Sequence, residues 1–471
     1  MWITIVIVFH ALGVISSINA VMTARTSQGA IAWVISLNTF PYATVPAYWI
    51  LGRSRFRGYV VARRSDDEII MQKLARLLER LQPYRIPDAE LTSVRMAAEK
   101  LADLPFLGGN SVELLVDGDQ TFDSILQGID AAEEYILFQF FIIKADEIGK
   151  LCKDHLVAKA KQGVKVYFLY DEIGSHALPA AYKNELRQAG AEVYNFHTRK
   201  GIRNHFQINF RNHRKVVIVD GKTAWIGGHN VGDEYLGRDP EFGHWRDTHV
   251  KIMGPAVLAA QISFVEDWHW ATDTYILQYP WLPVPAKDSD KKVLIVPSGP
   301  ADLLETATLM FHQAINAANE RIWIASPYFV PDDAILGALQ LAGLRGVDVR
   351  ILIPDKADHL LVYLAAFSYF EEASHTGVRF FRYTDGFLHQ KVMLIDDRVA
   401  TVGTANFDNR SFRLNFEITV VVADESFVTE VEQMLEEDFA HANEMKISDI
   451  NERSFWFKLS TRLARLTSPV Q

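Results

Sequence analysis

The chain has a single cysteine, Cys152, among 471 residues. One cysteine excludes an intrachain disulfide framework and a metal site built on paired cysteines, and it is compatible with a reducing compartment. Basic residues are also not in excess, because the formal net charge is −10 and the isoelectric point is about 5.9. A general nucleic-acid-binding protein needs a basic balance that neutralises phosphates. We therefore expect no nucleic-acid partner.

Two common ligand motifs are missing as well. No GxxxxGK run is present to bind the phosphates of a nucleotide. The chain has several histidines, but they lack the HExxH spacing and the cysteine partners of a zinc site. The histidines considered for such a site are His197, His205, His244, His249 and His269. We predict that the protein uses no metal and no cofactor.

Charged side chains are absent from residues 1–24, and after one arginine a second uncharged run covers residues 29–52. Each run is long enough to cross a hydrocarbon layer of about 30 Å, which predicts a transmembrane helical hairpin. The first run lacks the basic start of a signal peptide and is followed at once by another apolar run. This favours a retained hairpin over cleavage after Ala20. Prolines in the second run are expected to kink it or make it partly re-entrant, at Pro41 and Pro46.

Basic residues follow the second run directly. The connecting turn has only Arg25, whereas the stretch RSRFRGYVVARR carries Arg53, Arg55, Arg57, Arg63 and Arg64. The positive-inside rule then places everything after residue 52 in the cytoplasm. These arginines also attract anionic headgroups, each by about 1 kcal/mol near the surface. We expect a multi-pass membrane protein whose catalytic part faces the cytoplasm.

From about Gly108, helices alternate with short apolar strands, which is typical of an α/β fold with a buried sheet. The pattern occurs twice: AAEEYILFQFFI corresponds to AANERIWIASPYFV, and AKQGVKVYFLYD corresponds to GLRGVDVRILIPD. Matching positions are separated by 186 and then 183 residues, which indicates an internal duplication. The period is much longer than a solenoid repeat, so we expect two similar domains packed face to face.

These patterns divide the chain into five predicted segments. The proline-rich stretch YPWLPVPAKDSDKK separates the two copies. The segments are a pair of transmembrane helices (1–52), a helical connector (53–107), a first domain (108–285), a second domain (286–445) and a basic amphipathic segment (446–471).

The last segment, SFWFKLSTRLARL, sets apolar residues at helical spacing against basic ones. Two interpretations remain open for it. A basic amphipathic helix lies in the headgroup plane of a membrane, or the same helix docks on the protein core. The apolar positions are Trp456, Leu459, Leu463 and Leu466, and the basic ones are Lys458, Arg462 and Arg465.

A third repeated stretch carries the residues suited to chemistry. HRKVVIVDGKTAWIGGHN corresponds to HQKVMLIDDRVATVGTAN, now 176 residues apart. In each copy a histidine and a lysine lie two apart at the mouth of an apolar strand, so they share one face. An aspartate lies five residues after the lysine, and an asparagine follows a glycine further on. The two sets are His213, Lys215, Asp220 and Asn230, and His389, Lys391, Asp396 and Asn406.

Two histidines that face each other across an interface suit displacement at phosphorus. One neutral imidazole attacks and forms a covalent phosphohistidine, while the other protonates the departing alkoxide and later deprotonates the incoming hydroxyl. Two lysines and two asparagines then hold the non-bridging phosphate oxygens, an electrostatic contribution that is often the largest. This chemistry requires no metal.

Each histidine also needs a carboxylate on its other nitrogen to hold one tautomer and one direction. Asp247, which lies 34 residues after His213, and Glu417, which lies 28 after His389, each open the next apolar strand. They are the candidate orienting acids, with a surface salt bridge as the alternative. The motif aspartates end their strands instead, where we expect hydrogen bonds to loop amides more than direct chemistry.

The paired motifs resemble the HxKxxxxD signatures of the phospholipase D superfamily. The chain is similar over essentially its whole length to the bacterial cardiolipin synthases, which also carry two N-terminal membrane segments. Further matching stretches are DEYLGRD at 233–239, WRDTH at 245–249 and the NFD-RS---NFE pattern at 406–417. The middle residues of NHRK and LHQK differ, and we expect them to face away from the site and to matter little.

The resemblance implies a phosphatidyltransferase of the bacterial cytoplasmic (inner) membrane. Such an enzyme joins two phosphatidylglycerol molecules and releases glycerol through a phosphatidyl-histidine intermediate, with phosphatidylglycerol and anionic membrane lipids as its partners. In the superfamily the N-terminal histidine is often the nucleophile and the C-terminal one the acid. This assigns His213 and His389 respectively, although the symmetry of the halves leaves the roles exchangeable. The oligomeric state and the use of phosphatidylethanolamine as second substrate stay open.

Three other functions are alternatives for this sequence. A phospholipase D-type hydrolase uses the same fold, with water in place of the lipid alcohol. A nuclease of the superfamily is disfavoured by the membrane segments and the acidic balance. A membrane scaffold or lipid-binding module with dead sites is disfavoured because both motifs are intact.

Overall fold

The computed structural model describes residues 2–24, 26–52, 56, 68–87, 93–197, 209–356 and 358–470. The basic residues on which the predicted membrane orientation rests lie outside these ranges: Arg25, Arg53, Arg55, Arg57, Arg63 and Arg64.

The N-terminal region forms three helices, α1 (Trp2–Thr23), α2 (Ser27–Thr39) and α3 (Pro41–Leu51). Among the described residues, α1 alone is long and apolar enough to cross a membrane. The second apolar run is divided at Phe40, whose backbone leaves the helical region (φ −140°, ψ 63°) ahead of Pro41. A residue before proline avoids the α conformation, and proline suits the first position of a helix. The expected second spanning helix, and with it the hairpin, is therefore not confirmed.

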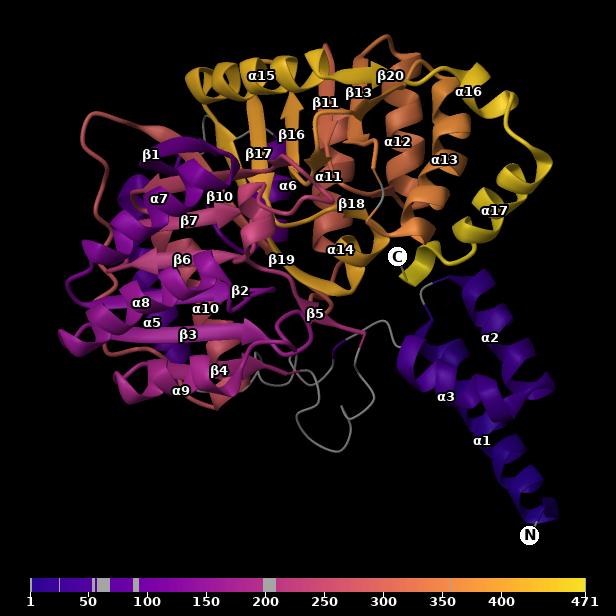
Figure 1. The fold of residues 1–471 in the computed structure, drawn as a ribbon, viewed down its shortest axis with the longest axis horizontal. Coiled ribbons are helices and arrows are strands. Elements are labelled where there is room, and N and C mark those ends of the chain that lie inside the picture. Colours follow the sequence, from indigo (N-terminus) through magenta and orange to yellow (C-terminus); the bar gives the residue numbers. More distant parts are fainter. Residues whose placement is uncertain are drawn as a thin grey trace.

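The three helices pack against one another (Figure 1), and polar side chains join them. The hydrogen bonds reach from the small polar face of α1 to the other two helices, while most isoleucines and valines of α1 are exposed. In a hydrocarbon environment such bonds satisfy groups that water cannot reach. The bonds are Tyr48 Oη to Asn19 (2.7 Å), Trp49 Nε1 to Ser16 (3.1 Å) and Asn38 Nδ2 to Ser17 (2.8 Å).

A short connector leads to the main body. It comprises α5 (Glu68–Leu81), η1 (Gln82–Tyr84) and α6 (Ser93–Ala102).

The body consists of two copies of one α/β unit. The first copy contains β1 (Leu107–Val116), α7 (Asp117–Asp130), β2 (Tyr135–Phe140), α8 (Glu147–Lys161), β3 (Lys165–Asp171), α9 (Ala180–Gln188), β4 (Glu192–Phe196), β5 (Arg211–Asn212), β6 (Val216–Val219), β7 (Thr223–Gly227), η4 (Asp233–Leu236), β8 (Trp245–Arg246), β9 (Thr248–Met253) and α10 (Ala256–Thr272).

The second copy repeats this order. It contains β10 (Lys291–Ser298), α11 (Thr306–Ala317), β11 (Arg321–Ala325), β12 (Phe329–Val330), α12 (Asp333–Leu344), β13 (Asp348–Pro354), α13 (Leu360–Ser374), β14 (Arg379–Tyr383), β15 (Phe387–Leu388), β16 (Val392–Ile395), β17 (Val399–Gly403), β18 (Phe407–Asp408), α14 (Asn409–Arg413), β19 (Asn415–Ala423), α15 (Glu425–Ala440) and β20 (Ala442–Glu444). The C-terminal segment adds α16 (Ile447–Asn451), α17 (Phe455–Arg465) and η5 (Ser468–Val470).

Equivalent strands take equivalent places in one continuous sheet. The first half runs β4-β3-β2-β6-β7-β9-β1, and the second runs β10-β19-β17-β16-β11-β13-β14, with β20 at the outer edge. The halves join where β1 and β10 pair antiparallel, as between Leu107 and Val293. Strands such as β2 and β6 are buried along their whole length, as their nearly continuous apolar sequences predict. The two α/β units inferred from the duplication are confirmed.

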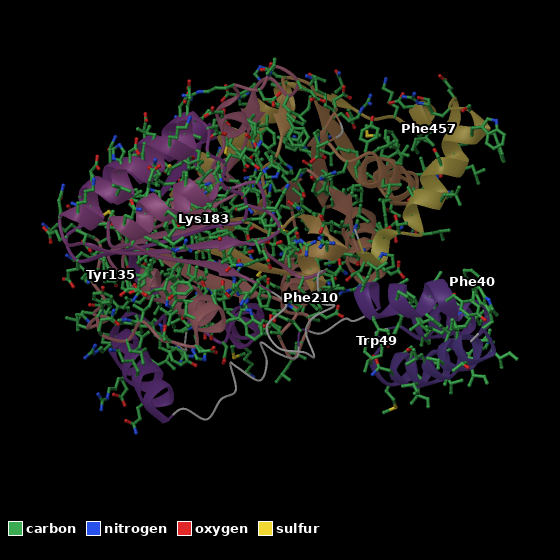
Figure 2. The ribbon with its side chains drawn as sticks, turned by 60° about the horizontal axis from the view of Figure 1, so that its bottom comes forward. Phe40, Trp49, Tyr135, Lys183, Phe210 and Phe457 are labelled. Atoms are coloured by element: carbon green, nitrogen blue, oxygen red, sulfur yellow. The ribbon has the colours of Figure 1, made fainter. Side chains whose placement is uncertain are left out.

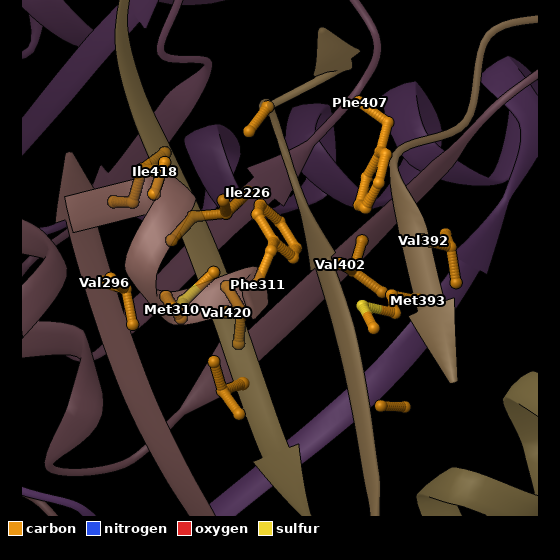
Figure 3. Packing of buried hydrophobic residues seen from close by; sticks show 14 of the residues in the cluster. Ile226, Val296, Met310, Phe311, Val392, Met393, Val402, Phe407, Ile418 and Val420 are labelled. Atoms are coloured by element: carbon orange, nitrogen blue, oxygen red, sulfur yellow. The ribbon is translucent and has the colours of Figure 1, made fainter. Parts of the chain in front are cut away.

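The halves also face each other, because β7 and β9 contact β17. Figure 3 shows Ile226 of β7 among Phe311, Ile418 and Val420 of the second half. This matches the predicted face-to-face packing, whereas the shared edge between β1 and β10 was not predicted.

Candidate active site

Two short ladders between the halves carry the motif histidines. Strand β5 pairs in parallel with the start of β19, and β15 pairs in the same way with β8. The ladders continue into the motifs, because His213 N donates to the carbonyl of Phe416 (2.9 Å) and His389 N donates to that of Arg246 (2.8 Å). Each histidine is therefore held against the strand that carries the other half's acid.

The candidate orienting acids contact the histidines in a crossed arrangement. Glu417 lies 2.9 Å from His213 Nδ1, and Asp247 lies 2.6 Å from His389 Nδ1. Both acids are fully buried. The sequence places each acid after the histidine of its own half, but the ladders between the halves bring it to the opposite one. The two halves are thus interdependent at the site.

The surroundings of the two acids keep them in place. Thr404 Oγ1 donates to Glu417 (2.6 Å), and Asn415 Nδ2 donates to the same carboxylate (3.1 Å). Burial alone would raise the pKa of Glu417, but His213 and Lys215 outweigh it and lower that pKa, so the group is ionised. Beside Asp247, a Cβ added to Gly228 would lie 2.0 Å from Oδ1, so only glycine fits there. Thr404 was missed from sequence, although it directly follows the motif glycine.

The two motif lysines are buried beside the histidines. Lys215 Nζ donates to the carbonyl of His213 (2.7 Å), and Lys391 Nζ lies 2.8 Å from His389 Nδ1. Burial lowers the pKa of Lys215 to about 7 and that of Lys391 to about 8. The carboxylates of Asp247 and Glu417 act in the opposite direction and limit this decrease. The charge of Lys391 lowers the pKa of Lys215 further, because the two ammonium groups are close enough to repel each other. An anion placed between them would favour their charged forms.

Burial disfavours the charged form of both motif imidazoles. Burial lowers the pKa of His213 to about 4 against the opposing pull of Glu417, and burial together with both lysines and His213 lowers the pKa of His389 as well. A neutral imidazole has a lone pair available for attack. Because each Nδ1 lies against a carboxylate, Nε2 is the nitrogen available to a substrate.

The two motif asparagines have different partners. Asn230 accepts from the amide of Ile142 (3.0 Å) and donates to Tyr235 Oη (2.9 Å). The side-chain oxygen of Asn406 is buried without a hydrogen-bond partner in the described part of the chain. Asn406 therefore has an acceptor oxygen with unused hydrogen-bonding capacity, whereas the side-chain oxygen of Asn230 is engaged.

The motif aspartates lie at the other end of strands β6 and β16, away from the histidines. Asp220 accepts from three successive amides, those of Glu133, Glu134 and Tyr135, each at 2.8 Å. Asp396 makes the equivalent contacts with the amides of residues 319 to 321. Both aspartates have positive φ, 53° and 48°, which close the turns after their strands. Their contacts fix the start of β2 and β11 and involve no reacting group.

The substitution Asp220→Asn is expected to act on stability. It replaces a charged acceptor of three amide bonds by a neutral one, at a cost of about 1–3 kcal/mol. The expected result is a lower midpoint of thermal unfolding for detergent-solubilised protein, with a much smaller change in the turnover of the folded fraction. Glu133→Gln, an exposed change beside the same turn, is the control and should leave the midpoint unchanged. An unchanged midpoint with lost turnover would assign Asp220 to the chemistry.

The middle residues of the two motifs are buried and paired with helices, a role that was not predicted from the sequence. Arg214 is buried, pairs with Asp267 on α10 (3.0 Å) and donates to the carbonyl of Glu417 (3.0 Å). Gln390 is also buried and donates to Asp438 on α15 (2.7 Å). Each middle residue therefore ties its motif to a helix carboxylate beneath the sheet. Because one residue is an arginine and the other a glutamine, the sequence does not reveal this shared role.

Comparison with known proteins agrees with this architecture. The family model described as "Cardiolipin synthase, PLD-like domain" matches residues 125–253 and 311–439, one match in each half. Cardiolipin synthase A of Pseudomonas putida strain W619 is 50% identical over 466 residues, covering 98% of this chain and 96% of that protein. Cardiolipin synthase A of Pseudomonas fluorescens strain Pf-5 is 48% identical over 473 residues, covering 99% and 98%.

A solved structure supports the fold independently. Phosphatidylserine synthase of Haemophilus influenzae Rd KW20 superposes with a TM-score of 0.60 at 17% identity, covering 81% of this chain and 100% of that one. At this identity the likeness shows the fold alone. The family match in both halves, the full-length relatives and the shared fold together show that the chain belongs to the cardiolipin synthase family of the phospholipase D superfamily.

Proposed function

We propose that this protein joins two phosphatidylglycerol molecules into cardiolipin and glycerol through a phosphatidyl-histidine intermediate. The observation that carries the proposal is the crossed pair of imidazole–carboxylate contacts, one histidine from each half, with two buried lysines beside them. This arrangement supplies two proton-transfer groups and fixed positive charge around one phosphorus atom.

In the first step, His213 Nε2 attacks the phosphorus of one phosphatidylglycerol, and the bond from phosphorus to the glycerol headgroup oxygen breaks. His389, protonated once the anionic phosphate has bound, gives its proton to that oxygen, and glycerol leaves. In the second step, the headgroup hydroxyl of another phosphatidylglycerol attacks the phosphorus while His389 takes its proton. The phosphorus–nitrogen bond breaks, which releases cardiolipin and restores the neutral His213.

The remaining polar groups hold the phosphate during both steps. Lys215 and Lys391 supply positive charge to the non-bridging oxygens. The side-chain NH₂ of Asn406 is the group that would donate to these oxygens, and its free side-chain oxygen can accept only from a substrate hydroxyl. Glu417 and Asp247 stabilise each imidazolium as it forms and keep its Nε2 directed at the phosphorus. Asn230 contributes less directly, because its amide is engaged with Ile142 and Tyr235.

We place the protein in the bacterial cytoplasmic membrane, as a multi-pass protein with both α/β halves on the cytoplasmic side. The apolar helix α1 supports membrane association, and the five arginines after residue 52 support the orientation. Phosphatidylglycerol and other anionic lipids are then the partners at the surface.

The value of kcat/KM is expected to fall as the pH rises above about 7 to 8. Lys215 and Lys391 have pKa values of about 7 and about 8, so they are charged below this range and lose their protons above it. Because kcat/KM reports the free enzyme, it follows these values directly. The fall in kcat should come at higher pH, since bound phosphate favours the charged lysines. Profiles measured at constant ionic strength check this, and a flat kcat/KM from pH 7 to 9 would contradict it.

The proposed reaction is tested with purified protein in vesicles that contain phosphatidylglycerol labelled in its headgroup glycerol. Transfer predicts labelled cardiolipin and labelled free glycerol in equal amounts. Hydrolysis, the alternative on the same fold, predicts phosphatidic acid with no cardiolipin. Phosphatidic acid as the main product would overturn the proposal.

A further inference from the structure

The C-terminal helix α17 is docked on the body by the residues that its sequence suggests for lipid headgroups. Arg462 pairs with Glu371 and Arg465 pairs with Glu372 on α13, both at 2.7 Å. Between them, Ala464 is buried against the body. Two of the three basic residues of the helix are therefore paired with acids of the protein, while Lys458 donates to the carbonyl of Asn451.

The apolar side of α17 points away from the body instead. Phe455 and Trp456 are 70% and 74% exposed, and Leu463 and Leu466 are 54% and 75% exposed. A surface helix of a soluble protein turns this side inward. Four large apolar side chains held outward on one helix indicate a partner that is itself apolar.

A second exposed apolar group is connected to the C-terminal end of this helix through α14 and η5. Leu303 and Leu304 are 67% and 59% exposed in the loop before α11. The next residue, Glu305, pairs with Arg413 of α14 (3.0 Å), and α14 contacts η5 directly after α17. The loop and the helix thus contribute to one surface, which we call the lipid-contact face: Leu303, Leu304, Phe455, Trp456, Leu463 and Leu466.

The membrane segment enters the body beside this face. Phe56, five residues after the end of α3, is fully buried against Phe210, Trp270 and Phe416. Its amide donates to the carbonyl of Pro300 (3.1 Å), at the start of the Leu303–Leu304 loop. Figures 1 and 2 both show α17 and helices α1 to α3 at the same end of the molecule.

From these contacts we infer that the lipid-contact face inserts into the same bilayer as α1. It thereby holds the second α/β half against the membrane surface. The partner is the phospholipid interface, where aromatic side chains such as Trp456 are favoured. Because Arg462 and Arg465 are paired with α13, the contact depends mainly on apolar burial and little on anionic headgroups. Phe416, which contacts Phe56, directly precedes Glu417, so the face also sets the candidate active site close to the membrane surface.

Site-specific fluorescence in the full-length protein tests this inference without turnover, so its outcome is independent of the proposed reaction. Single substitutions Leu304→Cys and Leu463→Cys are labelled with an environment-sensitive fluorophore in proteoliposomes. The native Cys152 is buried and its pKa is raised to about 12, so it stays unlabelled. Met253→Cys, an exposed apolar position on β9 of the first half, is the matched control.

Both labels on the face should shift to the blue and be quenched by lipids that carry a nitroxide in the upper acyl chain. The quenching should be equal in phosphatidylcholine vesicles with and without phosphatidylglycerol, and the control should remain unquenched. Absence of quenching at both positions would overturn the inference. A blue shift without lipid quenching would do so as well, because it would identify a second copy of the chain as the occupant. Quenching that requires phosphatidylglycerol would contradict the apolar character of the contact.

Discussion

Replacement of His213 by alanine is expected to lower kcat for cardiolipin formation by about 10³-fold or more. The change removes the proposed nucleophile, and members of such a catalytic unit contribute together, so the residual rate comes from the remaining groups. Substrate binding should change far less, since the lysines and Asn406 remain. Steady-state rates in vesicles of fixed composition measure this effect. His176→Ala, an exposed histidine outside the site, is the control and should keep full activity.

Mass spectrometry of the same variants assigns the roles of the two histidines. His389→Ala lacks both the acid of the first step and the base of the second. The first step should be slow, but the phosphatidyl adduct that does form on His213 should accumulate, because the incoming hydroxyl has no base. In His213→Ala no adduct should form at any residue. An adduct on His389 in the His213→Ala protein would reverse the assignment while leaving the two-step scheme intact.

Much of the fold follows from local sequence patterns. The repeated apolar strands and the glycines that end their helices predict two equivalent α/β units, since each pattern reflects burial within a single element. Residues His213, Lys215, His389 and Lys391 are found from sequence for the same reason. Each pair lies two apart on one strand and is repeated in register.

The relations between the halves could not be predicted in this way. The pairing of β1 with β10 and the crossing of Glu417 to His213 both depend on how two units meet, which no local period encodes. The buried role of Arg214 was obscured because its partner, Asp267, lies on a helix far along the chain. The prolines of the second apolar run predict the break at Pro41, where α3 begins, but they do not determine whether the divided run still crosses the membrane.

Substitution of either crossed acid, Glu417 or Asp247, is expected to have the second large effect on kcat. Glu417→Gln and Asp247→Asn are each expected to lower kcat by about 10²–10⁴-fold, because a neutral amide neither fixes the tautomer nor stabilises the imidazolium. Glu436→Gln, an exposed change on α15, is the matched control and should have no effect. Far-ultraviolet circular dichroism checks that the variants keep the fold, since both acids are buried.

A substrate with a good leaving group distinguishes the roles of Asp247 and Glu417. A phosphatidyl nitrophenyl ester needs no proton for its first step, so release of nitrophenol bypasses the acid His389 and its partner Asp247. In Asp247→Asn the pre-steady-state burst of nitrophenol should therefore recover to near the unmodified rate, although later turnovers still need His389 as base. In Glu417→Gln the burst should stay slow because His213 must still attack. Recovery of Glu417→Gln with continued loss in Asp247→Asn would mean that the histidine roles are exchanged. Equal recovery of both would show that neither acid supports the attacking imidazole, and the contact between Glu417 and His213 would then have no part in the first step.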